Sequence, residues 1–150
     1  MKKNSKNNSG MSLIVKTVTR WTILLIILYG LYITFFGHLG PGGGFAGGVI
    51  VVLSFIHIIL AYGKDFVVRR INEYLASILE TTGGLMFLSI AILGFATGIF
   101  FKDFLGQGKI FSLFSGGIIL PANVAIMLKV GFGMLSAFLC LILFSLHKGE

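Results

Sequence analysis

Few residues in this chain carry side chains that could do chemistry. Among its 150 residues there are five Asp and Glu, three His and one Cys. Glu80, His57 and Lys129 stand inside long apolar runs. A charged side chain in membrane hydrocarbon costs at least about 2.5 kcal/mol, so ionisable residues there usually face protein or water. If the runs span a membrane, these three residues are the candidates for an ion path or a partner contact.

Glu80 is the only carboxylate inside an apolar run. It could belong to an ion path, or it could snorkel or cap about one turn from the end of its helix; the two interpretations weigh equally. Lys129, about two turns into the last run, is the strongest candidate for a buried charge. The two runs cross in opposite directions, which predicts depths about 10 Å apart at 1.5 Å per residue. We therefore expect Lys129 to contact an acid of a partner subunit, or to snorkel, rather than to pair with Glu80.

His57 lies in the middle of the second apolar run, where it could relay protons. A neutral His that is hydrogen-bonded across helices is the simpler interpretation and is favoured. The three His are scattered and the acids do not cluster, so no metal site is expected. Neither a nucleophile–base pair nor a cofactor fingerprint is present, so we expect no cofactor and no enzyme activity. Cys140 stands alone in an apolar run and is expected to act as a small apolar residue.

The elements that hold these residues are predicted to be transmembrane helices. The chain is 56% hydrophobic and 11% charged, whereas soluble domains carry about 25% charged residues. Four apolar runs approach or exceed the roughly 20 residues that cross a bilayer. The sequence thus predicts an all-α integral membrane protein whose domain, residues 13–150, follows a flexible basic tail, 1–12. Its spans are expected at about 21–36, extended upstream by 13–18, and at about 45–62, 75–101 and 122–146. The first run is expected to be retained, not cleaved as a signal peptide.

The distribution of Lys and Arg predicts the orientation. Nine lie on the side of the termini and of the second connection, and two lie on the other side. The nine are Lys2, Lys3, Lys6, Lys16, Arg20, Lys64, Arg69, Arg70 and Lys148, and the two are Lys102 and Lys109. Since positive loops stay in the cytoplasm, both termini are expected inside (N-in/C-in), in the cell inner membrane. The net charge of +7 is accounted for by topology and anionic lipid, so no nucleic-acid partner is expected.

A glycine-rich segment between the first two runs is the most distinctive motif. It comprises Gly37, His38, Pro41, Gly42, Gly43, Gly44, Phe45, Gly47 and Gly48. Pro41 and the glycines disfavour a continuous helix, and no Lys-Ser/Thr follows, which argues against a phosphate-binding loop. Small residues four apart allow close helix packing, so a turn and a packing face are favoured over an ion or water path. Gly94 and Gly98 have the same spacing in the third run. The 102–121 connection is mixed, and its apolar part is expected at the interface or folded back.

The motif resembles that of the MnhB/MrpB subunits of multisubunit Na⁺/H⁺ antiporters. A later block, which includes Pro121, Asn123 and Gly131, resembles the segment before the last span of that family. Independently of the family, Asn123 is expected to cap the last helix. The resemblance covers nearly the whole chain. It implies four spans, other membrane subunits as partners, and Na⁺ and H⁺ as the ions of the complex.

Three functions remain open from the sequence. The first is a non-catalytic subunit of a Mrp-type antiporter that packs with other subunits and has a share in an ion or water path. The second is the same module in a redox-driven complex of the membrane-bound hydrogenase or sulfur-reductase type. The third is a self-sufficient homo-oligomeric exporter. One Glu, one Lys and one His within the runs are few for a complete coupled path, which favours a subunit over the exporter.

Overall fold

A computed structural model describes residues 11–63, 73–96, 98–103, 105–106, 108 and 112–147. Several predictions from the sequence fall on other residues. The tail up to residue 10, the basic connection 64–72, Lys109 and Lys148 lie outside the described residues.

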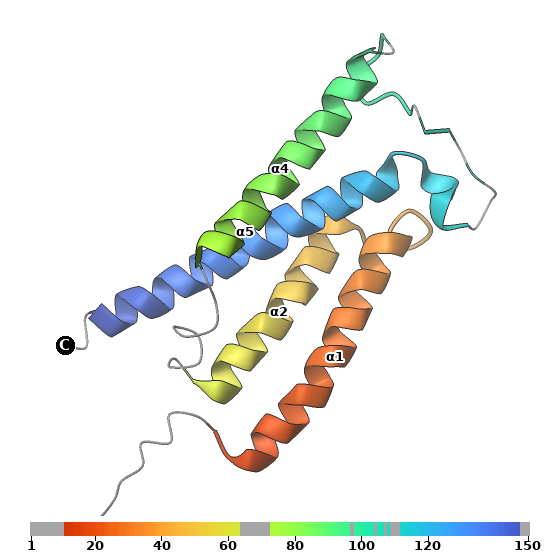
Figure 1. Ribbon diagram of the computed structural model, residues 1–150. Helices are drawn as coiled ribbons and strands as arrows, with labels where there is room; N and C mark the ends of the chain where they lie inside the picture. The colour runs from red at the N-terminus through yellow and green to blue at the C-terminus, as the bar shows by residue number, and fades with distance from the viewer. Residues whose placement is uncertain are drawn as a thin grey trace, which may run out of the picture.

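Four long helices form the described chain, which confirms the all-α fold with four membrane-spanning helices (Figure 1). They are α1 (Leu13–Phe36), α2 (Gly44–Tyr62), α4 (Glu73–Ala96) and α5 (Ile119–His147), with a short 3₁₀ helix η1 (Leu113–Gly116) before α5. The shortest, α2, has 19 residues, which is about 28 Å at the rise of an α-helix. This is close to the roughly 30 Å thickness of a hydrocarbon layer, and all four helices are long and apolar enough to cross a membrane.

Two helix ends differ by three residues or more from those predicted. α1 begins at Leu13, where the expected upstream extension begins, and Ser12 accepts a hydrogen bond from Val15 N–H at 3.5 Å. α5 begins at Ile119 instead of 122. Pro121 therefore lies in the first turn, where its missing N–H leaves no hydrogen bond unmade.

The third helix ends at Ala96, five residues before the predicted end at 101. Gly98 follows with a φ of +91° and donates its N–H to Phe95 O at 2.9 Å. Glycine adopts this left-handed conformation without steric penalty, so it ends the helix. The predicted pair of Gly94 and Gly98 on one helix face was therefore wrong: Gly94 packs against the returning backbone of Phe101 and Lys102.

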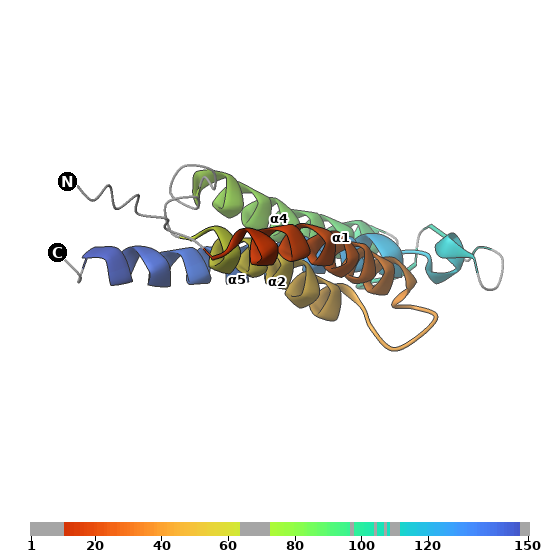
Figure 2. The ribbon, with the colours of Figure 1, turned by 90° about the horizontal axis from the view of Figure 1, so that it is seen from below.

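The helices lie side by side in the order α1, α2, α5, α4 (Figures 1 and 2). α2 and α5 run in the same direction at the centre, and α1 and α4 run against them at the edges (Figure 1). A buried cluster joins the central pair to α4 and consists of Val52, Ile59, Ala76, Leu135 and Leu139. Phe55 and Phe132 pack beside it with their ring centroids 6.3 Å apart. The arrangement is a shallow layer (Figure 2), so much of each helix surface remains uncovered by this chain.

The beginning of α1 and the end of α5 lie toward the same end of the helix layer (Figure 2). The start of α1 is tied to the end of α2, because Met11 N–H donates to Ala61 O at 3.1 Å. Lys16 Nζ lies 5.6 Å from the centroid of the Tyr62 ring at the same end. Four crossings thus place both ends of the helical layer on one side of the membrane. Which side faces the cytoplasm remains a prediction.

Candidate functional site

The glycine segment forms a tight turn between α1 and α2. Gly43 has a φ of +124°, and its N–H donates to Ile33 O at 3.3 Å. A Cβ on Gly37 would lie 2.5 Å from Gly43 Cα, so the backbones on the two sides of the turn are in contact. Pro41 is exposed at the tip, and the Phe45 side chain is 66% exposed at the start of α2. These two motif residues therefore point away from the packed layer.

Glycines at the start of α2 lie against both neighbouring helices. On one side Gly47 packs against α1, where a Cβ would overlap Thr34 Oγ1 and lie 2.9 Å from Gly30 O. On the other side Gly48 packs against α5, where a Cβ would lie 2.9 Å from Met127 O and 3.1 Å from Gly131 N. The absence of side chains at these positions lets the three helix backbones approach one another.

Asn123 caps α2 rather than its own helix. It is the fifth residue of α5, too far inside to cap that helix. Its Oδ1 instead accepts a hydrogen bond from Gly44 N–H at 3.2 Å. The N-cap of α2 is Gly43, which has no side chain to offer. The expected role of Asn123 was therefore wrong, because the packing of α5 on α2 supplies an acceptor for a helix end that lacks its own.

His38 joins the glycine turn to the connection before α5. Its Nε2 lies 3.0 Å from Ser115 Oγ and 3.3 Å from Ser112 O, both in or next to η1. A Cβ on Gly116 would lie 2.9 Å from His38 Cγ, so the ring rests on the backbone of η1. The other ring nitrogen, Nδ1, is buried and has no partner among the described residues. The ring thus fixes the connection to the end of α1.

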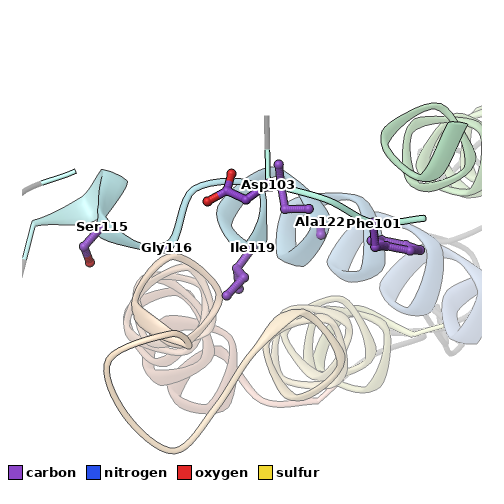
Figure 3. Close-up of a pocket in the computed structure, with 7 residues that line it drawn as sticks. Phe101, Asp103, Ser115, Gly116, Ile119 and Ala122 are labelled. Atoms are coloured by element: carbon purple, nitrogen blue, oxygen red, sulfur yellow. The ribbon is translucent and has the colours of Figure 1, made fainter. Parts of the chain in front are cut away.

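A cavity of about 480 Å³ opens beside this connection (Figure 3). Its polar lining comes from Asp103 and Ser115, and the remainder from Phe101, Gly116, Ile118, Ile119 and Ala122. The Asp103 carboxylate packs on Gly117 and accepts a hydrogen bond from Leu105 N–H at 3.2 Å. This bond to its own loop gives the carboxylate a structural role. An apolar cavity of about 560 Å³ borders the same connection and includes Phe35, Met86 and Pro121.

Glu80 and Lys129 form an ion pair across α4 and α5. Lys129 Nζ lies 2.8 Å from Glu80 Oε1. The Lys129 side chain is 53% exposed and that of Glu80 is 29% exposed, so the pair lies on the surface of the layer. The expectation that the two charges lie at different depths and do not pair was wrong.

Gly83 explains why the two charges meet. A Cβ on Gly83 would lie 2.6 Å from Lys129 N and 2.8 Å from Ala125 O, so α4 rests on that turn of α5. Because α4 and α5 are antiparallel, Glu80, which precedes Gly83 on α4, lies beside Gly133, which follows Lys129 on α5. A Cβ on Gly133 would lie 3.4 Å from Glu80 Oε1. Gly133 is four residues beyond Lys129, a rise of about 6 Å that a Lys side chain can span. Depths counted from the predicted helix ends missed this register because the ends of α4 and α5 do not lie at the same level.

His57 is half-buried on α2. Within the described residues it has no hydrogen-bond partner, and neither a hydrogen bond nor an ion pair joins it to Glu80 or Lys129. The favoured interpretation, a His hydrogen-bonded across helices, is therefore wrong for the described chain. No group of three or more metal-ligating side chains occurs among the described residues.

The sequence profile described as "Domain related to MnhB subunit of Na+/H+ antiporter" matches residues 14–136. The chain belongs to the MnhB family. The matched region includes all four helices apart from the first residue of α1 and the last turns of α5.

Curated members of the MnhB family are similar over a shorter stretch. The "Putative antiporter subunit mnhB2" of Staphylococcus aureus strains Newman and JH1 is 36% identical over 58 residues. That stretch is 39% of this chain and 41% of each relative, so it spans less than half of their length. A chain in the structure of the membrane-bound sulfane sulfur reductase, an archaeal respiratory membrane complex, has the same fold with a TM-score of 0.71 and 31% identity. The similarity covers 87% of this chain and 57% of that one.

Three contacts of this MnhB-family chain were not predicted from the sequence. They are the Asn123 cap on α2, the contact of His38 with η1, and the Glu80–Lys129 pair. Each joins residues 49 to 79 positions apart. The sequence does contain one signal, namely that α2 begins in a run of glycines without a capping side chain and so needs an acceptor from elsewhere.

Proposed function

We propose that the chain is a non-catalytic membrane subunit of a multisubunit Na⁺/H⁺ antiporter of the Mrp type. In this role it packs against other membrane subunits, and Glu80, Lys129 and His57 are its candidates for an ion path or a partner contact. Membership of the MnhB family supports this role. The observation that carries it is the exposed Glu80–Lys129 pair, which lies well inside two apolar helices.

The position of the pair favours a subunit over a self-sufficient protein. Lys129 lies ten residues after the start of α5 at Ile119, about 15 Å along the helix axis. Charged groups at that depth usually face protein or water, because lipid hydrocarbon solvates them poorly. In this layer the pair is partly exposed, so neighbouring subunits or a water-filled path are needed beside it.

A second assignment keeps the module and changes the complex. The fold is shared at 31% identity with a chain of the membrane-bound sulfane sulfur reductase. That likeness supports the same subunit within a redox-driven pump, in which other subunits carry the electron chemistry. We also propose an N-in/C-in orientation in the cell inner membrane, since the Lys and Arg bias of the sequence favours it.

Purification of the tagged chain in a mild detergent, followed by mass spectrometry, tests the assignment. Co-purification with large antiporter subunits and without redox proteins is the expected result. Co-purification with iron–sulfur subunits would favour the redox-driven complex instead. Recovery of the chain alone, as a homo-dimer that transports organic cations, would refute both and support an exporter.

A further inference from the structure

Lys129 has unused hydrogen-bonding capacity on the surface of the layer. An ammonium group has three donors, and within the described chain Nζ makes one hydrogen bond, to Glu80 Oε1 at 2.8 Å. The side chain remains 53% exposed, more than that of Glu80 at 29%. The open side of the pair is therefore mainly the side of the positive charge.

The surface next to the pair allows another helix to approach. A Cβ on Gly84 would lie 3.7 Å from Lys129 Cδ, and Gly133 lies beside the Glu80 carboxyl group. Neither glycine places a side chain over the ion pair. Small residues at such positions permit close helix contacts in membranes, so an approaching helix could bring a polar side chain to Nζ.

The depth of Lys129 selects the chemistry of its partner. The residue lies ten positions from the start of α5 and eighteen from its end at His147, about 15 and 27 Å along the axis. Lipid headgroups lie outside a hydrocarbon layer of about 30 Å. A carboxylate on a transmembrane helix can be presented at this depth, and it complements the exposed ammonium in charge.

We propose that the α4–α5 surface around Lys129 docks a transmembrane helix of a partner subunit, and that this helix carries a carboxylate that accepts a hydrogen bond from Lys129 Nζ. The proposal rests on the proposed function, because it requires a membrane complex. Lys129 is then held between two carboxylates, one from Glu80 and one from the partner.

A double-mutant cycle in the complete complex distinguishes this arrangement from an isolated pair. If a partner carboxylate contacts Lys129, the variant Glu80→Gln leaves Lys129 paired with that carboxylate alone. The partner is then retained at the wild-type ratio of partner to tagged chain. Lys129→Met leaves two facing carboxylates, and the partner-to-chain ratio falls about tenfold or more. The combination Glu80→Gln/Lys129→Met still leaves the partner acid without a cation, so the ratio stays low. Each ratio is normalised to the amount of the tagged chain in the membrane.

An isolated pair gives a different pattern. Restoration of the partner in the double variant, retention in Lys129→Met, or loss in Glu80→Gln would overturn the proposal, even though wild-type co-purification would still support the subunit assignment. If wild-type chain brings no partner, the proposed function itself fails.

Cross-linking of the wild-type complex gives an answer that does not depend on variant folding. A hydrophobic carbodiimide activates a carboxylate, the Lys129 amine attacks its carbon to form an amide, and the carbodiimide leaves as a urea. An amide that joins Lys129 to an acid of another chain is expected, and it disappears in Lys129→Arg. If an amide to Glu80 within the chain is the only product that contains Lys129, a partner carboxylate is ruled out.

Discussion

At the scale of single residues, most side-chain hydrogen bonds of the described chain are local, but those of His38, Asn123 and Lys129 connect segments that are distant in sequence. Asn123 supplies an acceptor to α2, and His38 holds η1 against the glycine turn. Such bonds matter in a membrane because an unpaired backbone group has no water to replace its partner. Their energetic contribution is therefore best measured by variants that keep or remove one acceptor or donor.

Substitution of Asn123 tests the cap on α2. Asn123→Ala leaves Gly44 N–H without its acceptor and is expected to lower the stability by about 1–2 kcal/mol. Asn123→Asp keeps an acceptor and places a negative charge at a helix N-terminus, so it should preserve stability. The midpoint of thermal aggregation of the purified complex, followed by size-exclusion chromatography, measures both. Equal midpoints for Ala and wild type would exclude a contribution of the cap.

Substitution of His38 tests the attachment of the connection. His38→Ala removes the contacts to Ser112 and Ser115, and we expect faster amide hydrogen exchange across η1 by about fivefold or more, which is the effect of losing about 1 kcal/mol of local stability. Exchange of α2 serves as the internal control. Unchanged exchange at Leu113–Gly116 would show that the connection holds without the His38 ring.

At the scale of the elements, glycines determine how closely the helices pack. Apolar side chains gain little from association in lipid, so close van der Waals contact is a main source of helix affinity there. Gly47 approaches α1 closely, Gly44 and Gly48 approach α5, and Gly83 of α4 approaches α5. The Glu80–Lys129 pair depends on the last of these contacts, because Gly83 sets the register of α4 on α5.

A matched pair of glycine substitutions tests this packing. Gly47→Ala places a Cβ against Thr34 Oγ1 and Gly30 O, and it should lower stability by about 1–3 kcal/mol, the usual effect of overpacking. Gly40→Ala is the control, because a Cβ there meets nothing within 4 Å. The thermal midpoint in detergent should fall for the first variant and stay constant for the second. A similar midpoint for both variants would show that α1 and α2 separate at little energetic cost.

At the scale of the whole molecule, the helices form a layer that buries Thr19, Thr34 and Ser54 but leaves its intramembrane ion pair at the surface. Two edge helices, α1 and α4, flank a central pair, and Glu80 and Lys129 remain on the surface. A layer of this kind is compatible with a subunit that completes its packing against neighbours. Residues at the two ends of the layer can be labelled to test its orientation in the membrane.

Cysteine labelling tests the orientation. In a Cys140→Ala background, Ser12→Cys at the start of α1 should react with a membrane-impermeant maleimide only after the cells are opened. Lys102→Cys, which lies exposed between α4 and α5, should react in intact cells. This result is expected because most Lys and Arg lie on the side of the termini. The reverse pattern would place the termini outside.

The sequence by itself determined that this protein belongs in a membrane and that its described part contains four membrane-spanning helices. Apolar runs of sufficient length specify spanning helices because backbone polar groups must be satisfied within the segment. The same local rules identified the glycine turn and selected Glu80 and Lys129 as unusual. They did not locate the helix ends at Ala96 and Ile119, since end positions depend on caps and single glycines.

Only the tertiary structure decided which of these residues meet. Asn123 caps α2 rather than α5, and Glu80 pairs with Lys129, because backbone contacts at Gly44, Gly48 and Gly83 set how the helices slide past one another. A shift of one helical turn moves a side chain by about 5.4 Å, which is enough to make or break an ion pair. That shift is a property of two packed surfaces, and the sequence of either helix alone does not contain it.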